Sequence, residues 1–278
     1  KMNLAIRGIA HNLGEKNAST FTEDLHKDRK VDFIMANPPF NLKGWRKEDE
    51  LTDDYRWRGY SVPRASNANY AWILHMISKL DVNHGIAGFL LANGALNDPD
   101  EFEIRKQLLE NDKVEAIIVL PRDMFYTTDI SVTLWIVNMN KKAGVVNGRQ
   151  LRDRTNEILF MDLRRWDNNI EEIVIDKGKK KKKTVLTDEQ IAEIKKVYSA
   201  WQSADKSEYK NEPEFCQSAT ISDLRAHNYT LAPSKYIEFI DHDLDINYEK
   251  EMARIQIEMQ DVMKAEKKSQ LMLEEAFR

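Results

Sequence analysis

The 278-residue sequence has a net charge of −4 and a mean hydropathy of −0.61, which excludes a protein that binds polyanions by gross charge alone. Its 42% hydrophobic residues, among them 10 Phe, 9 Tyr and 6 Trp, are enough for a packed core. The longest apolar runs are far shorter than the roughly 20 residues that a membrane span needs, so we expect no membrane segment and no signal peptide.

The cysteines and histidines indicate the redox compartment of the protein and whether it binds a metal. Cys216 is the single cysteine, so no internal disulfide can form, and we expect a cytoplasmic protein in a reducing compartment. The six histidines show no metal-ligand spacing and no cysteine pair accompanies them. We therefore expect no metal site.

The first predicted elements alternate between strand and helix. Residues 31–36 indicate a buried strand that must end at two prolines, since proline has no N–H to donate. This alternation predicts an α/β sheet with parallel strands and right-handed crossovers. Apolar spacing indicates the other elements in order: helices at 2–9, 70–80 and 101–109, and strands at 86–92, 114–120 and 131–138.

The second half of the chain is more polar. An edge strand is expected at residues 157–163. Residues 177–183 read KGKKKKK, a charge run typical of a solvated or disordered link, with phosphate contact as the alternative. Thr187 is placed to cap the helix that follows it. Residues 204–235 are expected to be rich in loops, with one short helix near residues 221–227.

The last residues, 247–278, have a pattern of their own. Apolar residues recur there at alternating spacings of four and three, with Glu and Lys between them. This pattern predicts an amphipathic helix of about 30 residues. Such a helix either pairs with a helix of another protein or folds back on its own domain.

A tetrapeptide with specific chemistry follows the strand at 31–36. It consists of Asn37, Pro38, Pro39 and Phe40. The side-chain oxygen of Asn37 and the carbonyl of Pro38 can both accept hydrogen bonds from one amino group, which would direct its lone pair toward an electrophile. Phe40 offers a stacking face for a base, worth about 1–3 kcal/mol. The alternative is a plain strand-ending Asn-Pro turn, but the whole tetrapeptide after an apolar strand favours catalysis.

The long loop at residues 38–67 mixes basic and aromatic residues. Arg56, Arg58 and Arg64 lie there among tyrosines and tryptophans. This mixture suits contacts to phosphates and to unstacked bases. A solvated loop without such contacts is the alternative for each arginine.

The tetrapeptide resembles the catalytic motif of the amino-group DNA methyltransferases that use S-adenosylmethionine. Several longer stretches are similar to the methylation subunit of type I restriction-modification systems, and they occur in the family's order. The resemblance runs from Lys1 to about Phe239. The matching stretches are KMNLAIRGI (1–9), DFIMANPPFNLKGW (32–45), NANYAWILH (67–75) and FYTTDISVTLW (125–135).

The resemblance implies a partial Rossmann-like methyltransferase sheet whose fourth strand is antiparallel, followed by a C-terminal helical extension. The implied reaction is methyl transfer from S-adenosylmethionine to N6 of an adenine flipped out of DNA. Asn37 and Pro38 would hold the amino group, and Phe40 would stack on the base. Phe125 would be a second base contact or, alternatively, a core phenylalanine. The residues implied at the cofactor are Phe21, Asn37 and Pro39.

Two features depart from the family's pattern. The family tends to have an acidic residue just before the position of Phe21, where this sequence has Ser19 and Thr20. No glycine-rich turn after a strand is found among the 10 glycines. The chain is therefore expected to be a C-terminal fragment, inactive alone, whose cofactor-binding motif lies mostly outside it.

The expected organisation is a catalytic domain at 1–165, an extension at 166–245 and a subunit-contact helix at 246–278. The partners implied by the resemblance are DNA, a restriction subunit and a DNA-specificity subunit that docks on the helix at 247–278. Two alternatives stay open. The tetrapeptide can hold a glutamine side-chain amide in a protein methyltransferase, or the chain can be a non-catalytic assembly module for the specificity subunit.

Overall fold

A computed structural model describes residues 2–125, 129–174, 180–205, 208–240 and 248–276. The chain divides into two compact units, Lys1–Glu238 and Phe239–Arg278. The first unit holds a mixed sheet with helices on both faces, and the second holds one long helix. The expected α/β class with a C-terminal helix is therefore confirmed.

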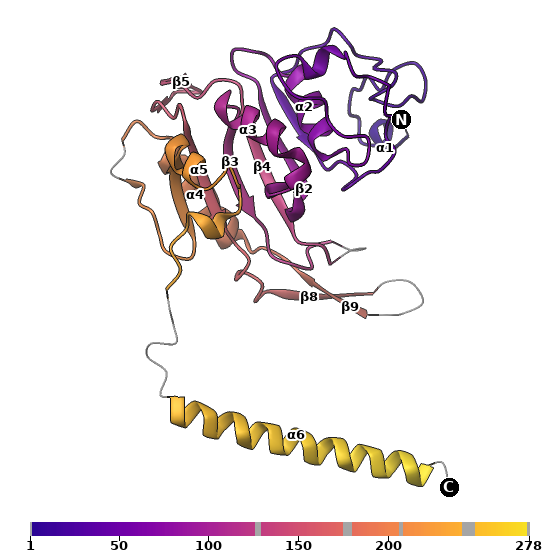
Figure 1. Ribbon diagram of the computed structural model, residues 1–278, viewed down its shortest axis with the longest axis vertical. Coiled ribbons are helices and arrows are strands. Elements are labelled where there is room, and N and C mark those ends of the chain that lie inside the picture. The colour runs from indigo at the N-terminus through magenta and orange to yellow at the C-terminus, as the bar shows by residue number, and fades with distance from the viewer. Residues whose placement is uncertain (1, 126–128, 175–179, 206–207, 241–247, 277–278) are drawn as a thin grey trace. The chain divides into compact units, whose positions relative to one another are not determined.

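The first unit is built on a six-stranded sheet in the order β1-β2-β4-β3-β7-β10 (Figure 1). β1 runs parallel to β2, and β3 runs parallel to β7. β4 is antiparallel to both of its neighbours, which confirms the expected antiparallel strand. The strands are β1 (Phe33–Ala36), β2 (Ile86–Ala92), β3 (Val114–Val119), β4 (Val132–Asn138), β7 (Glu157–Asp162) and β10 (Cys216–Thr220).

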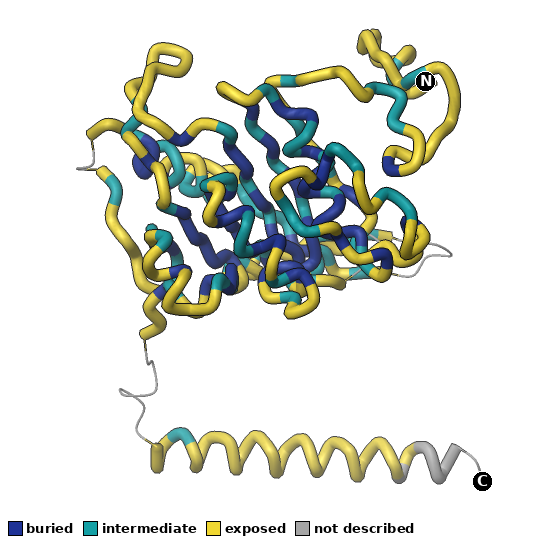
Figure 2. Tube along the Cα trace, turned by 45° about the horizontal axis from the view of Figure 1, so that its top comes forward, coloured by how far each residue is buried: buried dark blue, intermediate teal, exposed yellow. Residues whose placement is uncertain are grey.

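Alternate residues of the central strands supply two hydrophobic cores. On β3, Ile117 belongs to the core that contains α2, α3 and α5, and Ile118 belongs to the core that contains α4. Figure 2 shows the buried residues concentrated along the central strands. The helices are α1 (Met2–Ile6), α2 (Asn69–Lys79), α3 (Phe102–Glu110), α4 (Asp188–Gln202) and α5 (Ile221–Ala226).

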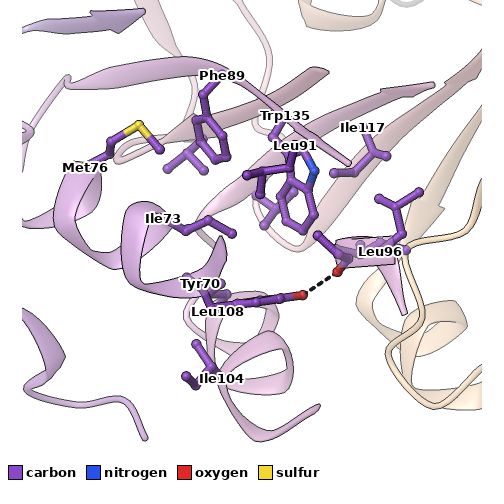
Figure 3. Close-up of a cluster of buried hydrophobic side chains, with 14 of the residues drawn as sticks. Tyr70, Ile73, Met76, Phe89, Leu91, Leu96, Ile104, Leu108, Ile117 and Trp135 are labelled. Carbon is purple, nitrogen blue, oxygen red and sulfur yellow. Dashed lines mark hydrogen bonds between the residues drawn. The ribbon is translucent and has the colours of Figure 1, made fainter. Parts of the chain in front are cut away.

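The larger core lies between the sheet and helices α2 and α3 (Figure 3). Trp135 of β4 stacks on Phe89 of β2, with ring centroids 6.1 Å apart and planes at 19°. Tyr70 of α2 is fully buried, and its hydroxyl donates to the Ala95 carbonyl at 2.8 Å. This bond satisfies a buried hydroxyl and fixes α2 against the chain that leaves β2.

Helix α4 begins where the sequence predicts it. The Thr187 hydroxyl accepts from the Gln190 backbone N–H, and the Gln190 side chain accepts from the Thr187 N–H. This reciprocal capping satisfies two N–H groups that have no partner within the helix. α4 then places Val197 and Trp201 against the second face of the sheet.

A strand that the sequence analysis missed changes the expected edge and the expected domain division. β10 pairs antiparallel with β7, so β7 is internal and fully flanked. α4 and α5 also pack on the sheet. Residues 1–165 and 166–238 therefore form one compact unit rather than two, which corrects the expected division.

A buried ion pair strengthens this connection. Glu115 of β3 has no exposed surface, and its Oε1 accepts from Arg154 Nε at 3.0 Å. Asn138 of β4 donates to Glu115 Oε2 at 2.7 Å, and Gln202 at the end of α4 donates to Oε1 at 3.2 Å. The Glu115 carboxylate thus joins strands β3 and β4 to the segment before β7 and to the end of α4.

Strand β1 was expected to be buried, but it is an edge strand. Its residues alternate between a covered and an open face, because successive side chains of a strand point to opposite faces. Phe33 is 75% exposed and Met35 is 95% exposed, whereas Ile34 and Ala36 pack on the larger core. The inner face of β1 therefore borders the site described below.

Two small hairpins stand apart from the main sheet. β5 (Gly144–Val146) pairs with β6 (Arg149–Leu151), and β8 (Ile170–Val174) pairs with β9 (Lys180–Thr184). The run at residues 177–183 was expected to be a solvated or disordered link, but Lys180 to Lys183 belong to the paired strand β9, on which Lys180 and Lys182 are exposed. Residues 177–179 lie outside the described residues.

The second unit contains α6 (Tyr248–Ala276), a helix of 29 residues. This confirms the predicted C-terminal helix. Its apolar residues are exposed along the helix (Figure 2). Of the described helices, none is long and apolar enough to cross a membrane. The exposed apolar side chains are Tyr248, Met252, Ile255, Ile257, Met259, Val262, Met263 and Met272.

Candidate active site

The Asn-Pro-Pro-Phe tetrapeptide lies directly after the last residue of β1. Strand pairing ends at Ala36, as expected for a segment followed by two residues without an N–H. Asn37 is exposed, Pro38 is buried and Phe40 is half-buried. The buried proline fixes the backbone of the turn while the amide of Asn37 stays accessible to a ligand.

The chain after Phe40 is fastened to the start of α2. Asn41 has φ +52°, a left-handed conformation that Asn tolerates better than most residues. Its N–H donates to Asn69 Oδ1 at 3.0 Å, and Asn69 Nδ2 donates to Asn41 Oδ1 at 2.8 Å. Asn69 is 2% exposed, so the anchor is held inside the domain. Asn69 lies in the NANYAWILH stretch, which was recognised by resemblance without a role for this residue.

Phe40 and Phe125 come together across 85 residues of sequence. Their ring centroids are 6.3 Å apart and their planes meet at 76°. Both side chains are half-buried, which leaves part of each ring open to a ligand. The structure thus brings together the two aromatic residues that the sequence analysis assigned to one base. Residues 126–128 lie outside the described residues.

A cavity of about 310 Å³ adjoins Asn37. It shares part of its wall with a larger cavity of about 690 Å³. The wall mixes apolar and polar groups, which suits an amphipathic organic ligand better than a bare phosphate. The smaller cavity is lined by Thr20, Ile34, Ala36, Asn37, Pro38, Trp72, His75, Met76 and Lys79.

The two basic side chains in the wall of the smaller cavity, His75 and Lys79, offer a ligand little unpaired positive charge. Burial, together with the nearby charge of Arg56, lowers the pKa of His75 to about 4, so the imidazole is neutral at pH 7. Lys79 is 8% exposed and its ammonium pairs with Asp24 at 2.5 Å. The same ammonium donates to the His26 carbonyl at 2.8 Å.

Phe21, implied by the resemblance at the cofactor, lies in the core. It is 3% exposed and packs between Trp45 and Trp72, with ring centroids 4.5 and 4.2 Å away. The preceding residue, Thr20, lines the cavity instead. Phe21 therefore shapes the wall from behind, and a contact to the cofactor stays a prediction. Pro39, the other implied neighbour, is exposed.

Arg56 occupies a structural position, which corrects its expected role. It is 4% exposed, and its guanidinium forms an ion pair with Asp54 at 2.7 Å. It also donates to the carbonyls of Thr20 at 3.0 Å and Phe21 at 2.6 Å. These bonds hold the segment before β1 to the long loop, so the guanidinium is not free to reach a phosphate.

Arg58 and Arg64 lie on the surface, as a phosphate contact requires. Arg64 pairs with Asp100 at 3.0 Å, and both side chains are more than half exposed. The backbone of Arg64 is held by Glu101 Oε1 at 3.3 Å. Burial raises the pKa of Glu101 to about 7. Among the described residues, no group of His, Cys, Asp or Glu is arranged to hold a metal ion.

Comparison with known structures defines the class of this fold. A type I restriction-modification methyltransferase subunit from Streptococcus thermophilus superposes with a TM-score of 0.65 and 25% identity, over 86% of this chain and 45% of that one. The EcoKI M protein superposes with a TM-score of 0.54 and 18% identity, over 94% of this chain and 55% of that one. The fold is that of methyltransferase subunits.

Sequence comparison then places the chain in a family. The N-6 DNA Methylase family model matches residues 1–244, so the chain belongs to that family. The HindI methylase subunit of Haemophilus influenzae is 39% identical over 85% of this chain and 48% of the relative. The MjaIX methylase subunit of Methanocaldococcus jannaschii is 32% identical over 96% and 45%. The chain spans about half the length of the curated relatives it matches.

Proposed function

We propose that this chain forms the base-holding part of a DNA adenine-N6 methyltransferase, the modification subunit of a type I restriction-modification complex. One observation carries the proposal. An Asn-Pro-Pro-Phe turn ends a strand beside a cavity, and the Phe40 ring lies 6.3 Å from Phe125. Membership of the N-6 DNA methylase family supports the same reading.

The proposed chemistry starts from a poor nucleophile. The exocyclic nitrogen of adenine shares its lone pair with the ring, and the base must leave the duplex before the nitrogen can react. Asn37 Oδ1 and the Pro38 carbonyl accept one hydrogen bond each from the amino group, which favours a pyramidal nitrogen. Phe40 stacks on the ring of the flipped base, and Phe125, which meets the Phe40 ring edge-to-face, gives the base a second aromatic contact.

The cofactor side of the proposal uses the wall beside Asn37. S-adenosylmethionine, when bound, supplies a methyl group on a positively charged sulfur. The adenine nitrogen held by Asn37 and Pro38 would accept this methyl group, the sulfur would leave as a neutral thioether, and the amino group would release one proton to solvent. The neutral His75 and the paired Lys79 suit a cationic ligand better than free positive charges would. We propose that the glycine-rich loop that completes cofactor binding lies outside these 278 residues.

The substrate class is tested by following a labelled methyl group. The complete modification complex is incubated with labelled S-adenosylmethionine, duplex DNA and candidate protein substrates in one reaction. We expect label in DNA, recovered as N6-methyladenine after hydrolysis. Label in a glutamine side chain, with none in DNA, would show a protein methyltransferase and contradict the proposal. No transfer to either substrate by the intact complex would favour an assembly module.

The partners proposed are DNA, a restriction subunit and a DNA-specificity subunit that packs on α6. Five exposed apolar residues of α6 recur at helical spacing on one side, so the helix has a face suited to another helix: Tyr248, Met252, Ile255, Met259 and Val262. The single buried cysteine fits the cytoplasmic setting expected from the sequence.

Substitutions on α6 test the subunit contact. Lysines at Met252 and Met259 introduce two charges into the apolar face, and we expect them to prevent co-purification with the specificity subunit while residues 1–238 stay folded. The matched control places lysines at Ala253 and Gln260, which are exposed, lie away from that face and give the same change in charge. An unchanged complex with the Met252→Lys/Met259→Lys variant would rule out this contact.

A further inference from the structure

The β8–β9 hairpin carries a run of lysines beside the candidate active site, and alternate members of the run are exposed. Four consecutive lysines, Lys180 to Lys183, occupy β9. The hairpin extends away from the six-stranded sheet (Figure 1). This local charge contrasts with the net charge of −4 of the whole chain. The proposed function assigns no role to it.

The hairpin is fastened to the loop that carries Phe125. The Thr184 N–H at its base donates to the Asp123 carbonyl at 3.0 Å, and Thr184 is 4% exposed. Lys181 forms an ion pair with Asp129 at 2.6 Å and lies 3.5 Å from the Phe125 carbonyl. β9 therefore has a defined position next to one of the two rings that frame the proposed base site.

Alternation along β9 separates the lysines into two sets. Lys181 lies on the face toward the Phe125 loop, so Lys180 and Lys182 lie on the opposite face. Both are exposed. Lys180 pairs with Glu172 at 2.9 Å, with side chains 69% and 56% exposed. An exposed ion pair of this kind contributes only about 0–1 kcal/mol to stability, so Lys180 can leave Glu172 for a more strongly charged partner such as a phosphate.

We propose that the outer face of β9, defined by Lys180 and Lys182, binds backbone phosphates of the DNA strand that flanks the flipped base. This inference rests on the proposed function, because it takes the Phe40–Phe125 pair as the base site. Two residues of a strand span about 6.6 Å, and each DNA strand carries a phosphate about every 3.4 Å of helix axis. The spacing of the two ammonium groups therefore suits two phosphates of the same DNA strand.

The surroundings favour DNA over an acidic protein surface. A base held at Phe40 and Phe125 stays attached to its own backbone, which must pass close to the loop at residues 121–125. The hairpin is fastened to that same loop. A chain with net negative charge also needs a local basic surface to approach DNA at all.

The test measures DNA binding by the complete modification complex as a function of salt. The Lys180→Gln/Lys182→Gln variant loses two phosphate contacts. Since each contact contributes about 0.9 to the slope of log K against log salt, we expect the slope to fall by about 1.8. Affinity at moderate salt should weaken on the order of tenfold. Phosphate contacts carry no sequence information, so cognate and non-cognate duplexes should lose equally.

The control variant is Lys195→Gln/Lys196→Gln, which removes two exposed lysines from α4 and should leave the slope unchanged. The Lys180→Arg/Lys182→Arg variant keeps the charge and should keep the slope. If the double variant proves unstable, Lys182→Gln carries the same test with half the effect, since no ion pair of Lys182 is found among the described residues.

An unchanged slope and affinity in the hairpin variant would overturn the inference. So would normal DNA binding with loss of the specificity subunit, because that result assigns the lysines to a protein partner. These outcomes are distinct from failure of the proposed function, which shows as a wild-type complex that binds DNA but transfers no methyl group to it.

Discussion

Replacing Asn37 by alanine is expected to lower the methylation rate of the complete complex at least a hundredfold. The substitution removes the side-chain oxygen that accepts a hydrogen bond from the adenine amino group. Loss of one preorganised hydrogen-bonding group at a reacting centre typically costs about 10²–10³ in rate. Asn37 is exposed and lies in a turn, so the fold and the DNA affinity should stay close to those of the wild type.

Two companion variants sharpen this result, which is read from single-turnover rates at saturating DNA and cofactor. Asn83→Ala removes an exposed asparagine near the start of β2 and should leave the rate unchanged. Asn37→Asp keeps acceptor oxygens and should retain more activity than alanine. A near wild-type rate for Asn37→Ala would show that the amide has no part in the reaction.

Replacing Glu115 by alanine is expected to destabilise the first unit by about 3–5 kcal/mol. The substitution removes the carboxylate and leaves the Arg154 guanidinium, which is 1% exposed, as an unpaired buried charge. Asn138 and Gln202 each lose an acceptor at the same time. The measurement is the free energy of unfolding in urea, followed by tryptophan fluorescence.

The control is Glu193→Ala, which breaks an exposed pair with Lys196 and should cost less than about 1 kcal/mol. A double variant, Glu115→Leu/Arg154→Met, removes both charges together and should recover much of the loss, because a buried apolar pair needs no desolvation of ions. A cost below about 1 kcal/mol for Glu115→Ala would mean that Arg154 finds another partner or reaches water.

Local patterns in the sequence predicted the elements that local chemistry decides. Thr187 indicates a helix start by itself, and its reciprocal cap with Gln190 forms there. Two prolines end β1 wherever the strand lies in the sheet. The Asn-Pro-Pro-Phe turn could therefore be placed at a strand end from the sequence alone.

Elements that depend on distant partners were missed. β10 has the sequence CQSAT, which has no strong strand pattern, and it forms because β7 offers it an edge. β9 is a run of lysines with low strand propensity, paired with β8. In both cases the hydrogen bonds of a neighbouring strand outweigh the preference of the residues.

The errors at the site have the same origin. Arg56 sits among polar and aromatic residues in the sequence, which suits a surface contact. Its burial depends on the carbonyls of Thr20 and Phe21, which lie about 35 residues earlier. The pairing of Phe40 with Phe125 was expected only through the resemblance, since no local spacing relates the two rings. Asn69 likewise gains its anchoring role only when α2 meets the turn.

The single cysteine gives the molecule an internal reporter of local opening. Cys216 begins β10, is 1% exposed, and burial raises the pKa of its thiol to about 11. A thiol reagent can reach it only when the packing around the start of β10 opens, and no second cysteine competes for the reagent. The rate of labelling in native buffer therefore measures how often this edge of the first unit opens. Applied to the Glu115 variants, it would separate local opening at this edge from unfolding of the whole unit.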